Sequence, residues 1–145
     1  MTAGVHFIDT NMLVRHLTQD HAQQSPACTA LLTLAERNDI QLTTSESVVT
    51  EVVQVLSSPR LYNFPRVQVS RLLTALLSLP GMRCAQRPVY LHALALYAQE
   101  AIDFPDCLTA AHMHQERIGT LYSYDRDFDR FAWVERREPD GMDAS

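Results

Sequence analysis

The sequence lacks the features that mark secreted or membrane-spanning proteins. No apolar run approaches the roughly 20 residues that cross a membrane, and the first residues lack the basic and then apolar pattern of a signal peptide. The three cysteines, Cys28, Cys84 and Cys107, are odd in number, scattered and without a C-x-x-C spacing. This usage predicts reduced, buried thiols in a cytoplasmic protein that makes no membrane contact.

Glycine is also scarce, with 4 residues in 145, while 46% of the chain is hydrophobic. This composition is typical of a compact, helix-rich domain, and the length fits a single domain with a substantial core. We expect that domain to span residues 1–137 and the polar residues 138–145 to form a disordered tail.

Acidic residues are absent from Val52 to Gln99, a segment that holds five arginines and is therefore at +5. The remainder carries the other 7 arginines and all 17 acids, and the whole chain is at −5. This net charge argues against bulk electrostatic adhesion to nucleic acid. The segment has two explanations: chance with a leucine-rich helical face, or a positive surface beside an acidic cluster, suited to a polyanion that must also meet metal ions.

The stretch from Val5 to Asn11 combines an apolar run with a polar end. Val5 to Ile8 show almost no polar alternation, which predicts a parallel strand covered on both faces. The next three residues, Asp-Thr-Asn, cap the helix that follows. Asp9 would then lie at the carboxyl edge of a parallel sheet, where open α/β folds bind ligands. From this stretch alone, a plain helix cap and a catalytic carboxylate are equally good interpretations.

Short apolar runs alternate with helical periodicity along the rest of the chain. The predicted strands lie at 5–8, 39–43, 82–84, 120–123 and 132–135, and the later helices at about 26–38, 44–56, 66–79, 88–101 and 103–117. Strands that alternate with helices imply right-handed crossovers and a parallel sheet. The expected fold class is α/β: a three-layer domain whose short parallel sheet of about five strands is flanked by helices.

Carboxylates recur where these elements meet one edge of the predicted sheet. Asp9 and Asp125 leave two strands there, and Asp106 lies in the first turn of a helix that starts from the same side, with Asp103 one turn earlier. Glu51 falls on the margin of the apolar stripe of its helix. Each acid also has a simpler explanation as a first-turn residue, a solvated turn or a solvent-facing glutamate. Jointly, however, those explanations leave the shared edge unaccounted for.

Gathered carboxylates need a counter-charge. Two of them about 4 Å apart repel by roughly 4 kcal/mol at an effective dielectric constant of 20. Oxygen ligands without a nearby Cys or His point to Mg²⁺ or Mn²⁺. His112 and His114 are two apart on a helix and make a poor metal pair. Glu46 is assigned elsewhere, because it completes a T-x-x-E capping box from Thr43.

Four short motifs occur in order along the chain. A strand ends in D-T-N, S-x-x-x-x-x-E runs from Ser45 to Glu51, D-F-x-D begins a helix, and a second strand ends in S-x-D-x-x-F. Together these motifs resemble those of the PIN-domain nucleases, and within them the VapC-type toxins of bacterial toxin–antitoxin pairs. The resemblance runs from Val5 to about Val134.

The resemblance implies a role for individual residues. It places the catalytic, metal-binding acids on Asp9, Glu51, Asp106 and Asp125. Auxiliary roles fall on Asn11 as the polar partner of Asp9, on Asp103, on Ser123, and on Asp127 and Asp129, either of which could replace or assist Asp125. The family usually has Thr where Ser123 stands, and Ser keeps the hydroxyl. The arginine-only middle segment would be part of the RNA-facing or dimer surface, where Arg60, Arg66 or Arg71 would contact phosphates.

The same resemblance implies a metal-dependent endoribonuclease. One or two Mg²⁺ (or Mn²⁺) ions would activate water for in-line attack, leaving a 5′-phosphate and a 3′-hydroxyl. It further implies a homodimer and a small antitoxin protein that places a basic side chain in the acidic pocket. Two alternatives remain: a PIN-like module that binds RNA or protein with little or no cleavage, and a metal-dependent phosphatase. The phosphatase motif requires a second Asp where Asn11 stands.

Overall fold

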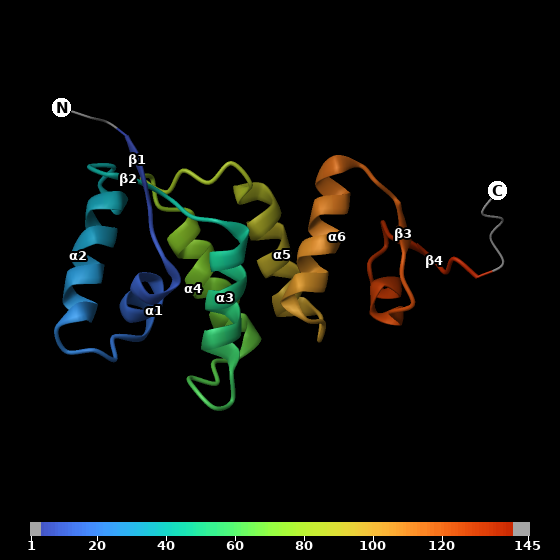
Figure 1. Cartoon of the computed structure of the whole chain (residues 1–145), viewed down its shortest axis with the longest axis horizontal. Helices are drawn as coiled ribbons and strands as arrows, with labels where there is room; N and C mark the ends of the chain where they lie inside the picture. The colour runs from blue at the N-terminus through green and yellow to red at the C-terminus, as the bar shows by residue number, and fades with distance from the viewer. Residues whose placement is uncertain (1–3, 141–145) are drawn as a thin grey trace.

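Residues 4–140 are described by the structure, which is a computed structural model (Figure 1). In this range the strands are β1 (Val5–Phe7), β2 (Gln41–Thr43), β3 (Thr120–Tyr122) and β4 (Glu135–Arg137). The helices are α1 (Thr10–Thr18), α2 (Gln24–Glu36), α3 (Glu46–Ser57), α4 (Arg66–Leu77), α5 (Arg87–Gln99), α6 (Phe104–Glu116) and the 3₁₀ helix η1 (Arg126–Arg130). The α/β class is confirmed, and none of these helices is long and apolar enough to cross a membrane.

The strands form two separate parallel pairs. β1 pairs with β2, with His6 opposite Leu42, and β3 pairs with β4. The sheet is thus smaller and more divided than the about five strands expected. The predicted third strand is reduced to one bridge between Met82 and Leu42, because the chain turns again where Arg87 donates its N–H to Cys84. The predicted fifth strand begins only at Glu135, since the preceding residues form a turn.

Helix α3 begins at Glu46 because Ser45 caps it. Ser45 Oγ accepts a hydrogen bond from the N–H of Val48 (3.2 Å), which satisfies one free donor of the first turn. The expected capping box from Thr43 is therefore wrong, since Thr43 ends β2 two residues before the N-cap Ser45. The carboxylate of Glu46 instead lies 2.6 Å from Nε2 of His112, and this contact joins α3 to α6.

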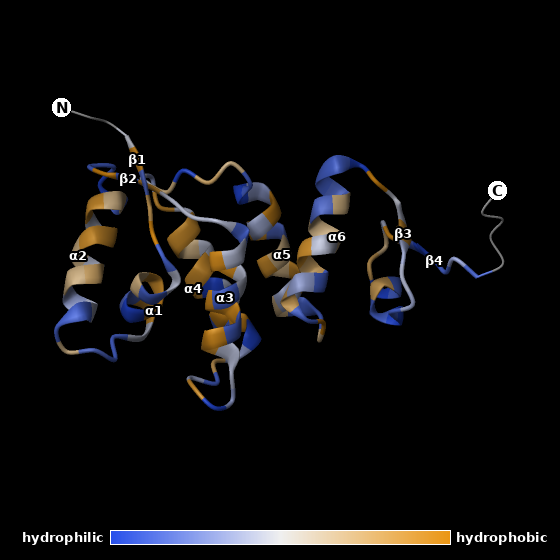
Figure 2. Ribbon diagram, viewed as in Figure 1, coloured by the Kyte–Doolittle hydropathy of each residue, from blue (hydrophilic) through white to orange (hydrophobic). Residues whose placement is uncertain are grey.

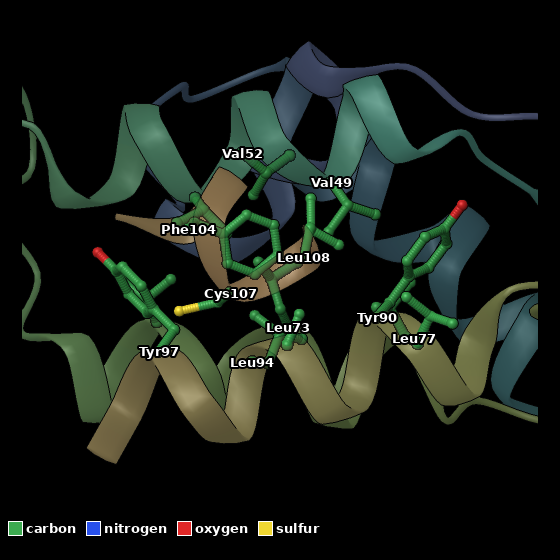
Figure 3. Packing of buried hydrophobic residues seen from close by; sticks show 14 of the residues in the cluster. Val49, Val52, Leu73, Leu77, Tyr90, Leu94, Tyr97, Phe104, Cys107 and Leu108 are labelled. Atoms are coloured by element: carbon green, nitrogen blue, oxygen red, sulfur yellow. The ribbon is translucent and has the colours of Figure 1, made fainter. Parts of the chain in front are cut away.

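A common core lies between α3, α4, α5 and α6. Figure 3 shows Val49 and Val52 of α3 facing Leu73, Leu94 and Leu108 from the other three helices. The helices present mixed apolar and polar stretches in Figure 2, as expected for elements that bury one face. All three cysteines are buried and free, as predicted, and burial raises the pKa of the Cys107 thiol to about 11.

The C-terminal unit, defined as residues 120–137 with β3, η1 and β4, packs against α5 and α6. Trp133 donates its indole N–H to the carbonyl of Ala110 (2.8 Å) and lies 5.3 and 5.2 Å from the rings of His92 and His114. Phe131 beside it is 2% exposed. The expected tail at 138–145 falls partly, at 141–145, outside the described residues.

Candidate metal centre

Three aspartates of the C-terminal half lie close together. One carboxylate oxygen from each of Asp106, Asp125 and Asp127 lies within 4.8 Å of the other two. Asp106 lies in the first turn of α6, Asp125 is the N-cap of η1, and Asp127 lies in the first turn of η1. We call these three residues the aspartate cluster. The structure thus brings Asp106 and Asp125 together and adds Asp127 to them.

Two hydrogen bonds after β3 fix the turn that holds Asp125 and Asp127 close together. Ser123 Oγ accepts the N–H of Asp125 (3.0 Å), and Asp125 Oδ1 accepts the N–H of Asp127 (2.9 Å). Such side-chain turns fix the backbone locally. Asp129 is directed elsewhere, because its carboxylate accepts Nε of Arg136 (3.0 Å). Of the two ambiguous aspartates, Asp127 therefore belongs to the cluster and Asp129 to an ion pair.

Negative charge in the cluster is costly. Burial raises the pKa of Asp106, and the charges of Asp125, Asp103 and Asp127 raise it further. Asp103, the residue before α6, contributes through its charge without belonging to the cluster. A divalent cation would remove this repulsion, and three carboxylates without Cys or His form an all-oxygen donor set that suits Mg²⁺ or Mn²⁺.

Asp9 and Glu51 form a second group, joined by Thr10. Asp9 follows β1 and caps α1, with Oδ1 accepting the N–H of Thr10 (2.7 Å). The hydroxyl of Thr10, a residue only 4% exposed, donates to Glu51 Oε1 (2.5 Å). We call Asp9 and Glu51 the N-terminal pair. Both side chains face solvent, while the threonine between them is buried.

The two groups do not meet within one chain. The aspartate cluster contains neither Asp9 nor Glu51. Figure 1 shows why: β1 lies toward one end of the molecule and β3 toward the other, with the central helices between them. Asn11 is exposed beside α2, and in the described part of the chain no hydrogen bond joins it to Asp9. The four principal acids thus form two halves of the site that the sequence indicated.

The three predicted RNA-contacting arginines have different surroundings. Arg60 and Arg71 are exposed. Arg66 is half-buried, with its guanidinium 3.9 Å from the ring centroid of Tyr97 and donating to the carbonyls of Glu100 and Ile102. Arg66 therefore fastens α4 to the segment between α5 and α6, which leaves fewer of its donors for a phosphate.

Sequence reasoning missed two polar contacts. The first is the link that Thr10 makes between Asp9 and Glu51, because the sequence analysis assigns the threonine of D-T-N no role beyond capping. The pairing of Glu46 with His112 spans 66 positions of the sequence, and no local pattern announces it. The signal available for Thr10 was its place directly after a buried apolar run, where a hydroxyl requires a partner.

Comparison with known families agrees with the resemblance that the four sequence motifs indicated. The PIN domain family matches residues 6–134, and no curated protein matches the chain. The match covers most of the 145 residues, so the chain belongs to the PIN domain family. PIN domains are generally metal-dependent nucleases, and the aspartate cluster fits the divalent metal ions that this family uses.

Proposed function

We propose that this chain is a Mg²⁺- or Mn²⁺-dependent endoribonuclease that acts as the toxin of a type II toxin–antitoxin pair in the cytoplasm. The observation that carries the nuclease assignment is the aspartate cluster in a PIN domain. Burial and then the charges of the neighbouring aspartates raise the pKa of Asp106, which is the behaviour of a site that a cation would stabilise. The ordered D-T-N and S-x-D-x-x-F motifs, with their VapC-like spacing, support the toxin assignment.

The residues have separate tasks in this proposal. Asp106, Asp125 and Asp127 hold the cation, while Asp9 and Glu51 complete its surroundings. When bound, the cation lowers the pKa of a coordinated water and offsets charge that develops on the scissile phosphate. Ser123 positions Asp125 through the backbone, and Thr10 positions Glu51. The exposed Arg60 and Arg71 supply phosphate contacts along the RNA.

The partners follow from the same proposal. RNA is the substrate, a second copy of the chain forms a homodimer, and a small antitoxin protein neutralises the acids with a basic side chain. The net charge of −5 makes a basic partner segment favourable.

A cleavage assay with labelled RNA tests the assignment. Parent protein should cut RNA with Mg²⁺ or Mn²⁺, stop when EDTA is added, and leave 5′-phosphate ends. Asp106→Asn should lose the activity, while Asp129→Asn, whose carboxylate pairs with Arg136, should keep it. Intact RNA at every metal concentration, with no calorimetric binding of Mn²⁺, would instead favour a PIN-like binding module.

A further inference from the structure

Among the described residues, β1 and β3 each have one edge that pairs with no other strand, and the two edges match each other. Ile8, directly after β1, donates its N–H to Thr43, so the backbone of residues 6 and 8 faces β2, whereas that of Val5 and Phe7 faces away. In the described part of the chain no strand pairs with that outer edge. β1 is therefore an edge strand, although its sequence is that of a strand covered on both sides.

The other free edge belongs to β3. Ser123 donates its N–H to Arg137 and Gly119 accepts from Glu135, so alternate residues of β3 face β4. By the same alternation, Thr120 and Tyr122 present their N–H and C=O groups outward. Both free edges come from parallel pairs and can continue a parallel ladder.

Exposed apolar side chains gather at these two edges. Nine large hydrophobic residues are exposed in the described chain, and five of them lie on or beside β1 and β3. These five are Val5 (53%), Phe7 (73%), Ile118 (51%), Tyr122 (52%) and Tyr124 (61%). Natural proteins protect such edges with charge, proline or a covering element, because open edges pair with other chains. β1 (VHF) and β3 (TLY) contain no proline, acid, lysine or arginine that would protect them in this way.

The chain's own β3 is held away from its own β1. Only three residues, 117–119, connect α6 to β3, and they span at most about 11 Å. The C-terminal unit is also fixed to α6 by the Trp133–Ala110 hydrogen bond and by the packing of Phe131. Pairing of β3 with β1 of the same chain would break these contacts, whereas a second copy can pair its β3 with this β1 and keep all of them.

We propose that two copies of this chain pair reciprocally, β1 of each with β3 of the other, and that each metal centre is shared between the copies. A parallel β1–β3 pair places the carboxyl ends of both strands at one edge. Asp9 follows β1 directly and Asp125 follows β3 closely, so the N-terminal pair of one copy meets the aspartate cluster of its partner. The exchange is two-fold symmetric and closed, which yields two composite sites.

This inference rests on the proposed nuclease function, and mixing inactive variants tests it. Asp9→Asn and Asp106→Asn proteins should each be inactive. A mixed dimer has one site with both substitutions and one site with neither. Unfolding and refolding an equal mixture should therefore restore about a quarter of parental cleavage, because half of the dimers are mixed and half of their sites are intact.

The matched control mixes Asp9→Asn with Glu51→Gln. Both changes fall in the N-terminal pair, so every site of every dimer carries one of them and cleavage should stay absent. Restoration by Asp9→Asn with Asp106→Asn but not by the control supports shared sites. An active parent with no restoration in either mixture would overturn the proposal.

A second measurement does not depend on cleavage. Sedimentation should show a dimer for the parent and for Phe7→Leu, and a monomer for Phe7→Pro, because proline removes an outward N–H without touching the β2 ladder. Tyr122→Pro, which removes an outward N–H from β3, should also give a monomer. Circular dichroism should confirm that all variants fold. A monomeric parent, or folded proline variants that remain dimeric, would overturn the pairing. If the pairing holds while no RNA is cut, the proposed function alone fails.

Discussion

The N-terminal pair and the aspartate cluster hold their carboxylates in opposite ways. Asp9 and Glu51 are exposed, and the buried Thr10 links them, because its N–H donates to Asp9 and its hydroxyl donates to Glu51. In the cluster, by contrast, the N–H of Asp127 donates to the Asp125 carboxylate, and one oxygen from each of the three carboxylates lies within 4.8 Å of the other two. Burial and the charges of its neighbours raise the pKa of Asp106. The aspartate cluster is therefore the part of the site that a bound cation would stabilise most.

The largest expected effect comes from Asp125→Asn. Loss of one carboxylate from the cluster should lower metal-dependent cleavage by about 100-fold or more, since the site must balance the charge of the transition state. Initial rates on one RNA at saturating Mn²⁺ measure it.

The matched control is Asp129→Asn, four residues away and paired with Arg136. Its initial cleavage rate should stay within a few-fold of that of the parent. Equal losses in the two variants would mean that the cluster has no special place in the reaction.

A smaller effect should follow Thr10→Val. The change keeps the shape of the side chain but removes the donor to Glu51, and it should cost about 1 kcal/mol of unfolding free energy. Cleavage should fall as well, and less than for Asp125→Asn. Urea unfolding and initial rates measure the two effects.

Thr10→Ser restores the hydroxyl and so serves as the control. It should recover both stability and rate if Thr10 positions Glu51. A serine variant as slow as the valine variant would show that only packing matters at this position.

The burial of Asp106 and the charge repulsion in the cluster predict a gain in stability from Asp106→Asn without metal. The folded-state pKa of Asp106 is raised, so the folded chain binds more protons than the unfolded chain between the two pKa values. Parental stability therefore falls as the pH rises through that window, and the loss persists at neutral pH. The variant should gain less than about 1 kcal/mol at pH 7 in EDTA, because solvent screens the site.

Thermal unfolding in EDTA at pH 7 and at pH 3 checks this prediction. The advantage of the variant should shrink at the lower pH, where Asp106 is protonated in both states. A variant that is less stable than the parent at pH 7 would show that the cluster is not repulsive.

The smallest effect is expected for Glu46→Gln. The Glu46–His112 contact is partly exposed, and such pairs contribute up to about 1 kcal/mol to stability. Cleavage should stay within a few-fold of the parent, because Glu46 belongs to neither acidic group. A collapse in rate would move the catalytic glutamate from Glu51 to Glu46.

Local rules predicted the elements well, and long-range pairing poorly. The helices lie where periodicity and Pro88 or Asp103 place them, because capping and amphipathic faces are local properties. The division into two strand pairs was not predictable. The apolar run at Val5–Ile8 predicts a strand with neighbours on both sides, but it does not indicate whether a neighbouring strand belongs to the same chain or to another. The side-chain turn after Ser123 could have been read from S-x-D-x-D, and it would have favoured Asp127 over Asp129.

Calorimetric titration of Mn²⁺ into the metal-free protein tests the central claim most directly. The parent and Asp129→Asn should bind Mn²⁺ saturably, and Asp106→Asn and Asp127→Asn should show a strong loss of affinity. Binding of equal affinity in all four proteins, or none in the parent, would contradict it.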